Sequence, residues 1–202
     1  MKRFILILAA LLSVLFTFAQ DNSEVTYSVL SAENDTICLS ADEYKLWQMI
    51  NEYRKQKRLP AIPLSRSLTY VAQKHAEDLS LYFKFSSRCN MHTWSDKGNW
   101  TSCCYSADHK KASCMWDKPR EMTSYPGNGY EISHGGDEYY VVTPDFALTG
   151  WKGSTSHNEV ILNKGIWKDV KWKAIGIGMY KNFAVVWFGE EEDTEAEVTK
   201  CK

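Results

Sequence analysis

The chain begins with an almost unbroken apolar run and then changes to mixed apolar and polar positions. The run covers residues 4–16, follows a basic pair at positions 2 and 3, and precedes small residues around Ala19. This order is typical of a cleavable signal peptide, and the run is shorter than the roughly 20 apolar residues that cross a bilayer. We predict a signal peptide over residues 1–19, an extended leader over residues 20–40, and a secreted or periplasmic protein without a stable membrane anchor.

Helical periodicity follows the leader. Apolar residues recur at helical spacing from the cap Ser40 to the basic cluster at 54–58, which predicts a first helix. After a proline-containing loop, a second helix begins at Ser65 or Ser67 and carries an apolar face as far as Leu79. These two amphipathic helices form the first third of a domain that we place at residues 41–202.

Regular patterns stop between residues 86 and 126, where Cys, Trp, Gly and Ser dominate. Such a segment predicts a long functional loop held by disulfides. Beyond it we expect a strand at 130–133, helices from 144 or 145 to 151 and from about 154 to 162, and strands at 174–180 and 183–188. The last two strands are separated by two residues, which predicts a hairpin.

Charge and length narrow the class of protein. Removal of Lys2 and Arg3 with the signal peptide leaves 22 basic against 25 acidic residues, a net charge of −3. A weakly acidic chain argues against nucleic acid as a partner. The mature length suits one domain.

All six cysteines lie beyond the signal peptide, and an even number in an exported chain favours disulfides. Chain ends are often close in space, so we expect Cys38 to pair with Cys201. Cys103 and Cys104 are neighbours that cannot bond each other without strain, so one should reach Cys89 and the other Cys114. The sequence leaves open which of the two reaches which.

A zinc site is the alternative for part of this cluster. Cys89 and His92 have a possible ligand spacing, and His109 and Cys114 could complete a four-ligand knot. The export signal favours disulfides over this knot.

Several segments resemble one family when they are taken in order. They are Leu-Trp-Gln-Met-Ile-Asn-Glu-Tyr-Arg at 46–54, the helix at 71–79, Trp-Lys-Gly-Ser-Thr-Ser-His-Asn at 151–158, Trp-Lys-Ala-Ile-Gly-Ile-Gly at 172–178, and Val-Trp-Phe-Gly at 186–189. This order resembles the CAP superfamily of cysteine-rich secretory, antigen 5 and pathogenesis-related proteins, in its bacterial form. The resemblance implies an α+β fold, a three-layer α/β/α sandwich with a small, mostly antiparallel sheet.

The resemblance also implies a cleft lined by two histidines and two acidic residues. His92 and His157 match the histidines, and Glu131 is the best match to one acid. Ser154 stands at the position of the other acid, so this set is incomplete. A metal ion, a lipid or another small ligand is the expected occupant of the cleft.

Three functions remain open for these residues. In a binding protein, neutral His92 and His157 would hold zinc, another divalent metal or a small ligand. In a metal-dependent hydrolase, Glu131 would take a proton from the metal-bound water. In a protein that faces a host or partner, the cysteine-rich loop would make the contact.

The remaining histidines have simpler interpretations. His75 lies on the apolar face of the second helix and is expected to be a satisfied core histidine. His109 lies in a lysine-rich segment and should be solvated, whereas His134 is close enough to Glu131 in sequence to remain an outside candidate. Ser154 shares a helical face with His157, but we expect it to cap a helix.

Three tryptophans, Trp94, Trp100 and Trp116, lie in the cysteine-rich loop. Exposed aromatic rings could stack on sugars or apolar molecules. We favour the alternative that they shield the disulfides and form a small satellite core. The acidic run from Glu190 to Asp193 is expected to be solvated.

Overall fold

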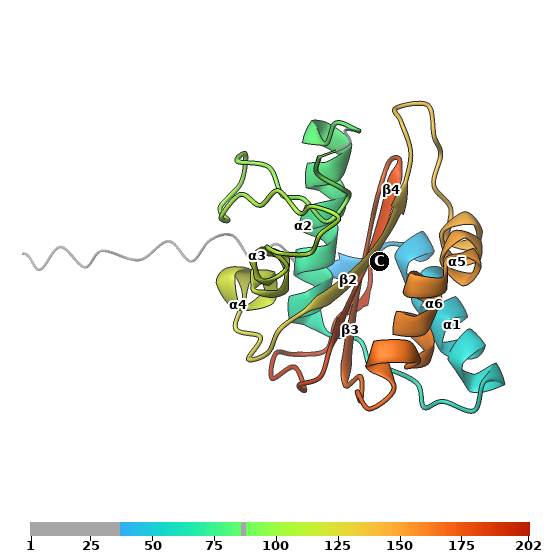
Figure 1. The fold of residues 1–202 in the computed structure, drawn as a ribbon. Coiled ribbons are helices and arrows are strands. Elements are labelled where there is room, and N and C mark those ends of the chain that lie inside the picture. Colours follow the sequence, from blue (N-terminus) through green and yellow to red (C-terminus); the bar gives the residue numbers. More distant parts are fainter. Residues whose placement is uncertain (1–36, 86–87) are drawn as a thin grey trace, which may run out of the picture. The chain divides into compact units, whose positions relative to one another are not determined.

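Helices lie on both faces of a small antiparallel sheet (Figure 1). The computed structural model describes residues 37–85 and 88–202. The predicted signal peptide and most of the leader lie outside these residues. The three strands are β2 (Tyr130–Gly135), β3 (Ala174–Tyr180) and β4 (Phe183–Gly189), in the order β2-β4-β3. β2 is therefore an edge strand, and one of its sides has no neighbouring strand of this sheet.

The helices form two layers (Figure 1). One contains α2 (Arg66–Tyr82) with the short helices α3 (Ser113–Trp116) and α4 (Lys118–Met122); the other contains α1 (Ala41–Gln56), α5 (Pro144–Gly153) and α6 (Thr155–Leu162). A short 3-10 helix, η1 (Gly165–Trp167), follows α6, and β1 (Cys38–Leu39) pairs in parallel with β5 (Thr199–Lys200). The expected three-layer α/β/α sandwich is confirmed. Among the described residues, no helix combines the length and the apolar character needed to cross a bilayer.

The central strand β4 supplies both halves of the core. All seven of its residues are buried. Val186 and Phe188 pack with the helices α1, α5 and α6, whereas Val185 and Trp187 pack with α2 and the cysteine-rich loop. Successive strand residues point to opposite faces, so an uninterrupted apolar strand is the sequence pattern of a sheet covered on both sides.

Two glycines let α2 approach the sheet. A Cβ atom on Gly176 would lie 2.0 Å from the backbone carbon of Leu68, and one on Gly178 would lie 2.2 Å from that of Ala72. Both glycines lie on the α2 face of β3, while the alternate residues Ile175 and Ile177 pack into the opposite core. The two glycines of the Ile-Gly-Ile-Gly pattern therefore allow α2 to pack closely against β3.

The helix starts follow the predicted caps. Ser40 and Glu43 form a reciprocal capping box at α1, and the Ser65 hydroxyl accepts a hydrogen bond from the Leu68 N–H in the first turn of α2. The expectation that the acidic run is wholly solvated is wrong at Asp193. Its carboxylate accepts hydrogen bonds from the Ser65 hydroxyl at 2.6 Å and from the Ser67 amide at 2.8 Å. The C-terminal segment is thereby fixed to the start of α2.

The cysteines form three disulfides: Cys38–Cys201, Cys89–Cys104 and Cys103–Cys114. The terminal pairing is confirmed, and the two neighbouring cysteines do reach outward to different partners. Because Cys89 and Cys114 are both oxidised, the alternative zinc knot is excluded.

Candidate functional site

Glu131 is the centre of the candidate site. It projects from β2 towards α2, and its side chain is fully buried. One carboxylate oxygen contacts Nδ1 of His75, and the other lies 2.7 Å from Nδ1 of His92. Burial alone would raise the pKa of this carboxyl, but the charges and hydrogen bonds of the two histidines outweigh burial and lower it. Glu131 is therefore an ionised carboxylate whose two oxygens are both engaged.

His75 balances the charge of Glu131. It is fully buried on the inner face of α2 and stacks on Trp94, with ring centroids 4.1 Å apart. Its Nδ1 faces the carboxylate, and its Nε2 lies 3.0 Å from the carbonyl oxygen of Thr93. Since both partners are acceptors, the ring carries both protons when Glu131 is ionised. The expectation of a satisfied core histidine holds, but no sequence pattern indicated that His75 shares a carboxylate with His92.

His92 is held in one orientation by the loop around it. Its backbone N–H donates to the Asn90 side chain, and the edge of Tyr105 packs against its ring. Its Nδ1–H donates to Glu131, so Nε2 is the ring nitrogen that remains for a ligand. Its side chain is 17% exposed. Within the described residues, Nε2 has no protein partner, and His92 therefore offers one ring nitrogen in a fixed orientation.

His157 lies in the first turn of α6 and is half-buried. Burial lowers its pKa to about 4, protonation of His92 or His134 would lower it further, and Glu131 opposes this effect. His157 is therefore neutral near pH 7. Neither of its ring nitrogens has a hydrogen-bond partner among the residues that the structure describes.

Two further candidates have other partners. Nε2 of His134 lies 2.7 Å from the Tyr140 hydroxyl, and its ring packs against Gly150 of α5. Burial lowers the pKa of His134. The Ser154 hydroxyl faces Ser156 at 3.3 Å, and Ser154 stands at the N-cap of α6 without the capping hydrogen bond that we expected from it.

The donor set does not fit a metal site with three protein ligands. Over residues 37–85 and 88–202, no group of three or more His, Cys, Asp or Glu side chains is placed to hold a metal ion. Glu131 contacts His75 and His92 through its two oxygens. His75 contacts Glu131 and the Thr93 carbonyl through its two ring nitrogens. Zinc sites usually take three or four protein ligands. A site with only His92 and His157 as ligands stays a prediction.

The loop tryptophans have separate roles. Trp94 is 1% exposed and lies between His75 and Trp100, which fits the expected satellite core. Trp116 packs against Tyr130. Trp100 is half-buried and lines a groove on the outer side of α2. His109 is exposed, as expected, and its Nδ1 lies 2.9 Å from the Tyr105 hydroxyl.

Comparison with known proteins gives a family and several similar folds. The family described as CAP, the cysteine-rich secretory protein family, matches residues 47–186. No curated protein matches the chain.

Three solved structures are similar to the chain. An extracellular protein with an SCP domain from Bacillus anthracis str. Ames is 17% identical, with a TM-score of 0.51 over 74% of this chain and 40% of that one. An outer surface protein of Borrelia burgdorferi is 18% identical, with a TM-score of 0.49 over 75% and 93% of the two chains. A cysteine-rich secretory protein of Staphylococcus aureus subsp. aureus Mu50 is 16% identical, with a TM-score of 0.47 over 74% and 38%. The chain thus spans less than half of the Bacillus and Staphylococcus proteins.

Proposed function

Because the chain belongs to the cysteine-rich secretory protein (CAP) family, we propose that it is an extracellular binding protein whose small ligand is held by His92 and His157. The observation that carries the proposal is the Glu131 carboxylate, which is fully buried and fixes His92 so that Nε2 remains available. The predicted signal peptide and the three disulfides support action outside the cytoplasm.

The protonation of the two histidines defines the ligand's chemistry. In the neutral form of His92, Nε2 is an acceptor because the ring proton lies on Nδ1 towards Glu131. His157 is neutral near pH 7, since its pKa is lowered to about 4. Two neutral imidazoles suit a ligand with a hydroxyl or amine donor, such as a neutral lipid headgroup, and they also suit a divalent metal.

The hydrolase alternative has less support. The Glu131 carboxylate is fully buried and its oxygens contact His75 and His92, which leaves it poorly accessible to a water in the cleft. His92 could act as the base instead, with Glu131 as the group that positions it. Catalysis stays a prediction, and His92→Ala would abolish it.

Titration calorimetry tests the binding proposal with two probes, Zn²⁺ and the neutral lipid monolauroylglycerol. We expect one of them to bind the wild-type protein with one-to-one stoichiometry. His92→Gln and His157→Gln should each weaken that binding, because each removes one imidazole. His109→Gln is the matched control, since His109 is exposed and outside the site.

Two results would contradict the proposal. One is that neither probe binds the wild-type protein at millimolar concentration. The other is that a probe binds all four proteins equally, which would place its site elsewhere.

A further inference from the structure

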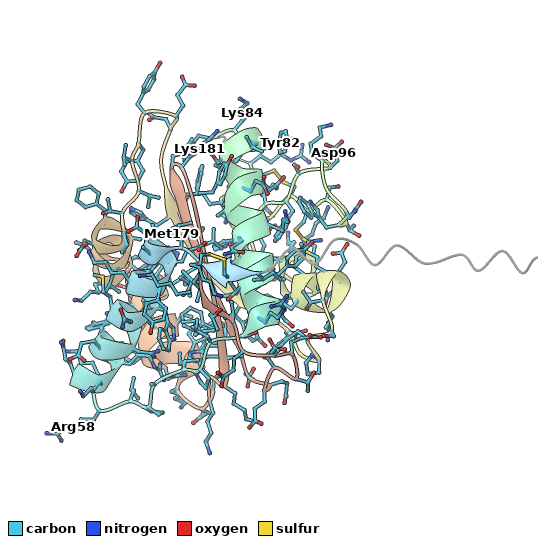
Figure 2. The ribbon with its side chains drawn as sticks, turned by 180° about the vertical axis from the view of Figure 1, so that it is seen from behind. Arg58, Tyr82, Lys84, Asp96, Met179 and Lys181 are labelled. Atoms are coloured by element: carbon cyan, nitrogen blue, oxygen red, sulfur yellow. A yellow bond between two sulfur atoms is a disulfide. The ribbon has the colours of Figure 1, made fainter. Side chains whose placement is uncertain are left out.

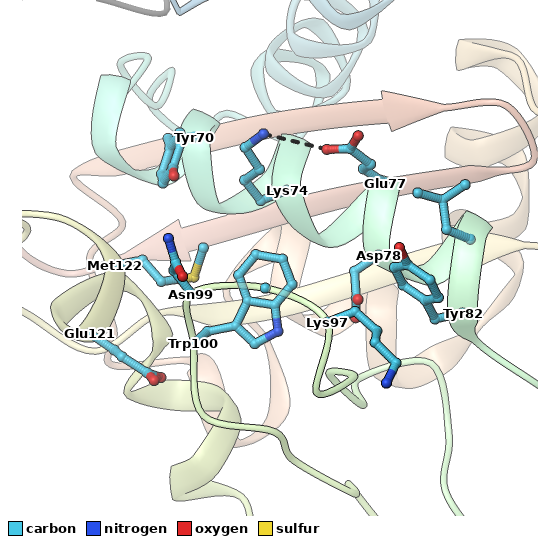
Figure 3. Close-up of a pocket in the computed structure, with 12 residues that line it drawn as sticks. Tyr70, Lys74, Glu77, Asp78, Tyr82, Lys97, Asn99, Trp100, Glu121 and Met122 are labelled. Carbon is cyan, nitrogen blue, oxygen red and sulfur yellow. Dashed lines mark hydrogen bonds and ion pairs between the residues drawn. The ribbon is translucent and has the colours of Figure 1, made fainter. Parts of the chain in front are cut away.

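A groove of about 430 Å³ lies between the outer face of α2 and the loop that follows it (Figure 3). Tyr70 and Tyr82 line it from α2, and Trp100 lines it from the loop. Figure 3 shows the Trp100 indole between the helix and α4, opposite Lys74. Small-molecule sites commonly have volumes of roughly 300–1,000 Å³. The groove is separate from the histidine site, which lies on the inner side of α2.

Trp100 is held rigidly before any ligand arrives. Its indole N–H donates to the Ser95 carbonyl at 3.0 Å, and its ring packs edge to face on Trp94. Asp78 of α2 accepts the Ser95 amide at 2.8 Å and so fixes this loop to the helix. An aromatic side chain that is already ordered loses little conformational entropy when a ligand stacks on it. Trp100 is therefore a preorganised stacking surface.

The charged groups beside the groove are paired with one another. Lys74 lies 3.4 Å from Glu77, and Lys97 lies 2.9 Å from Asp96. Glu121 contacts the buried Lys118. A polyanion or a polycation would have to displace these pairs, whereas a neutral ligand would not. The same charged groups can exchange hydrogen bonds with hydroxyls, which both donate and accept.

Two further hollows adjoin the groove along α2, one towards each end of the helix. A second hollow shares Tyr70 and Met122 with it and extends towards Arg66, and a third shares Asp78 and Tyr82 and extends to Lys84. Figure 2 shows the loop at Asp96 near the Tyr82 and Lys84 end of the helix. The three adjoining hollows, which we call the trough, together extend along most of α2, which suits a linear ligand with repeating units.

We propose that this trough binds a neutral oligosaccharide, with a sugar ring stacked on Trp100. The C–H face of a sugar ring carries partial positive charge and matches the negative face of an aromatic ring. The hydroxyls of the sugar can exchange hydrogen bonds with the paired charged groups beside the groove. An acyl chain would desolvate those charges without replacing their hydrogen bonds. An extended peptide would find no strand edge, because the lining comes from α2, a loop and α4.

Titration calorimetry with cellohexaose, maltohexaose and chitohexaose tests the proposal on the purified protein. We expect saturable binding of one of them. Trp100→Ala should weaken that binding roughly tenfold, and Trp100→Phe should weaken it less because a ring remains. Gly98→Ala should also weaken it, since a methyl group there would lie 2.2 Å from the Trp100 ring and displace it. Gly98→Ala keeps the Trp100 side chain and therefore tests whether its position, and not only its presence, is needed for binding.

Tyr139→Ala is the control, because Tyr139 is an 84% exposed aromatic residue outside the trough. It should bind like the wild type, and so should His92→Gln, which disables only the histidine site. The proposal is overturned if none of the three sugars binds, or if Trp100→Ala and Gly98→Ala bind as tightly as the wild type. It is also overturned if hexa-alanine or decanoate binds with this Trp100 dependence while the sugars do not.

Discussion

Glu131 shows how one buried side chain can organise several others. Its carboxylate carries one ion pair with His75 and one hydrogen bond with His92, in a place without water contact. Family resemblance identified Glu131 and His92 as candidate site residues from the sequence. The sequence did not place His75 beside them, because His75 is 56 residues from Glu131. The helical spacing of the apolar residues around His75 indicated only that it lies on a buried face.

Loss of this carboxylate should be costly. Glu131→Ala leaves His75 buried beside a cavity without its counter-charge, and breaking a buried ion pair commonly costs about 3–5 kcal/mol. We expect a loss of this size in the free energy of unfolding, measured with urea. Glu192→Ala, which removes an exposed carboxylate, should change stability little. Exposed ion pairs contribute at most about 1 kcal/mol. If Glu131→Ala lowers the free energy of unfolding by less than this, the ion pair is not buried as described.

The pH dependence of stability should report on His157. Its pKa falls from 6.5 to about 4 on folding, so between these values the unfolded chain binds more protons than the folded one. The stability that neutral His157 contributes is complete above pH 6.5 and is lost as the pH falls towards 4. The expected slope is at most about 1.4 kcal/mol per pH unit. Glu131, whose pKa is lowered from 4.5, contributes stability that is lost only below that pH.

Urea unfolding at several pH values separates these two groups. His157→Gln should flatten the curve between pH 6.5 and 4 while leaving the loss at lower pH in place. An unchanged slope in this variant would mean that His157 is solvated in the folded protein.

At the scale of elements, periodicity located the long helices and the final hairpin. α1, α2, α5, α6, β3 and β4 all lie close to their expected positions. β2 was expected to end at Ser133 but continues to Gly135, because it pairs with β4 along its whole length. The sequence did not indicate α3, α4, β1 or β5, which have only two to five residues each. Elements that short contain too few residues for a period to be recognised.

The contact between α2 and β3 gives a test at this scale. Gly178→Ala would place a methyl group against the backbone of Ala72, and overpacking of a tight contact commonly costs about 1–3 kcal/mol. We expect a lower melting temperature by circular dichroism. Gly153→Ala is the matched control, since nothing lies within 4 Å of a Cβ at that position and alanine favours the end of α5. Equal melting temperatures for both variants would contradict the close approach of α2.

At the scale of the whole molecule, the two ends of the described chain are joined. Cys38 is bonded to Cys201, β1 pairs with β5, and Asp193 caps α2 near the start of the domain. The sequence predicted the disulfide from the position of its cysteines, but it did not predict the strand pair or the cap. Both depend on contacts between segments far apart in the sequence, which no local pattern encodes. The contacts of Glu131 likewise join β2, α2 and the loop that carries His92.

Chain entropy predicts which disulfide stabilises the domain most. The Cys38–Cys201 bond spans 163 residues and the Cys89–Cys104 bond spans 15. Because the entropy that a cross-link removes from the unfolded chain grows with the logarithm of loop length, the longer loop should contribute about 2 kcal/mol more. We expect the double variant Cys38→Ser/Cys201→Ser to lose more stability in urea than Cys89→Ser/Cys104→Ser. The reverse order would mean that the cysteine-rich loop, rather than the joined ends, limits the stability of the fold.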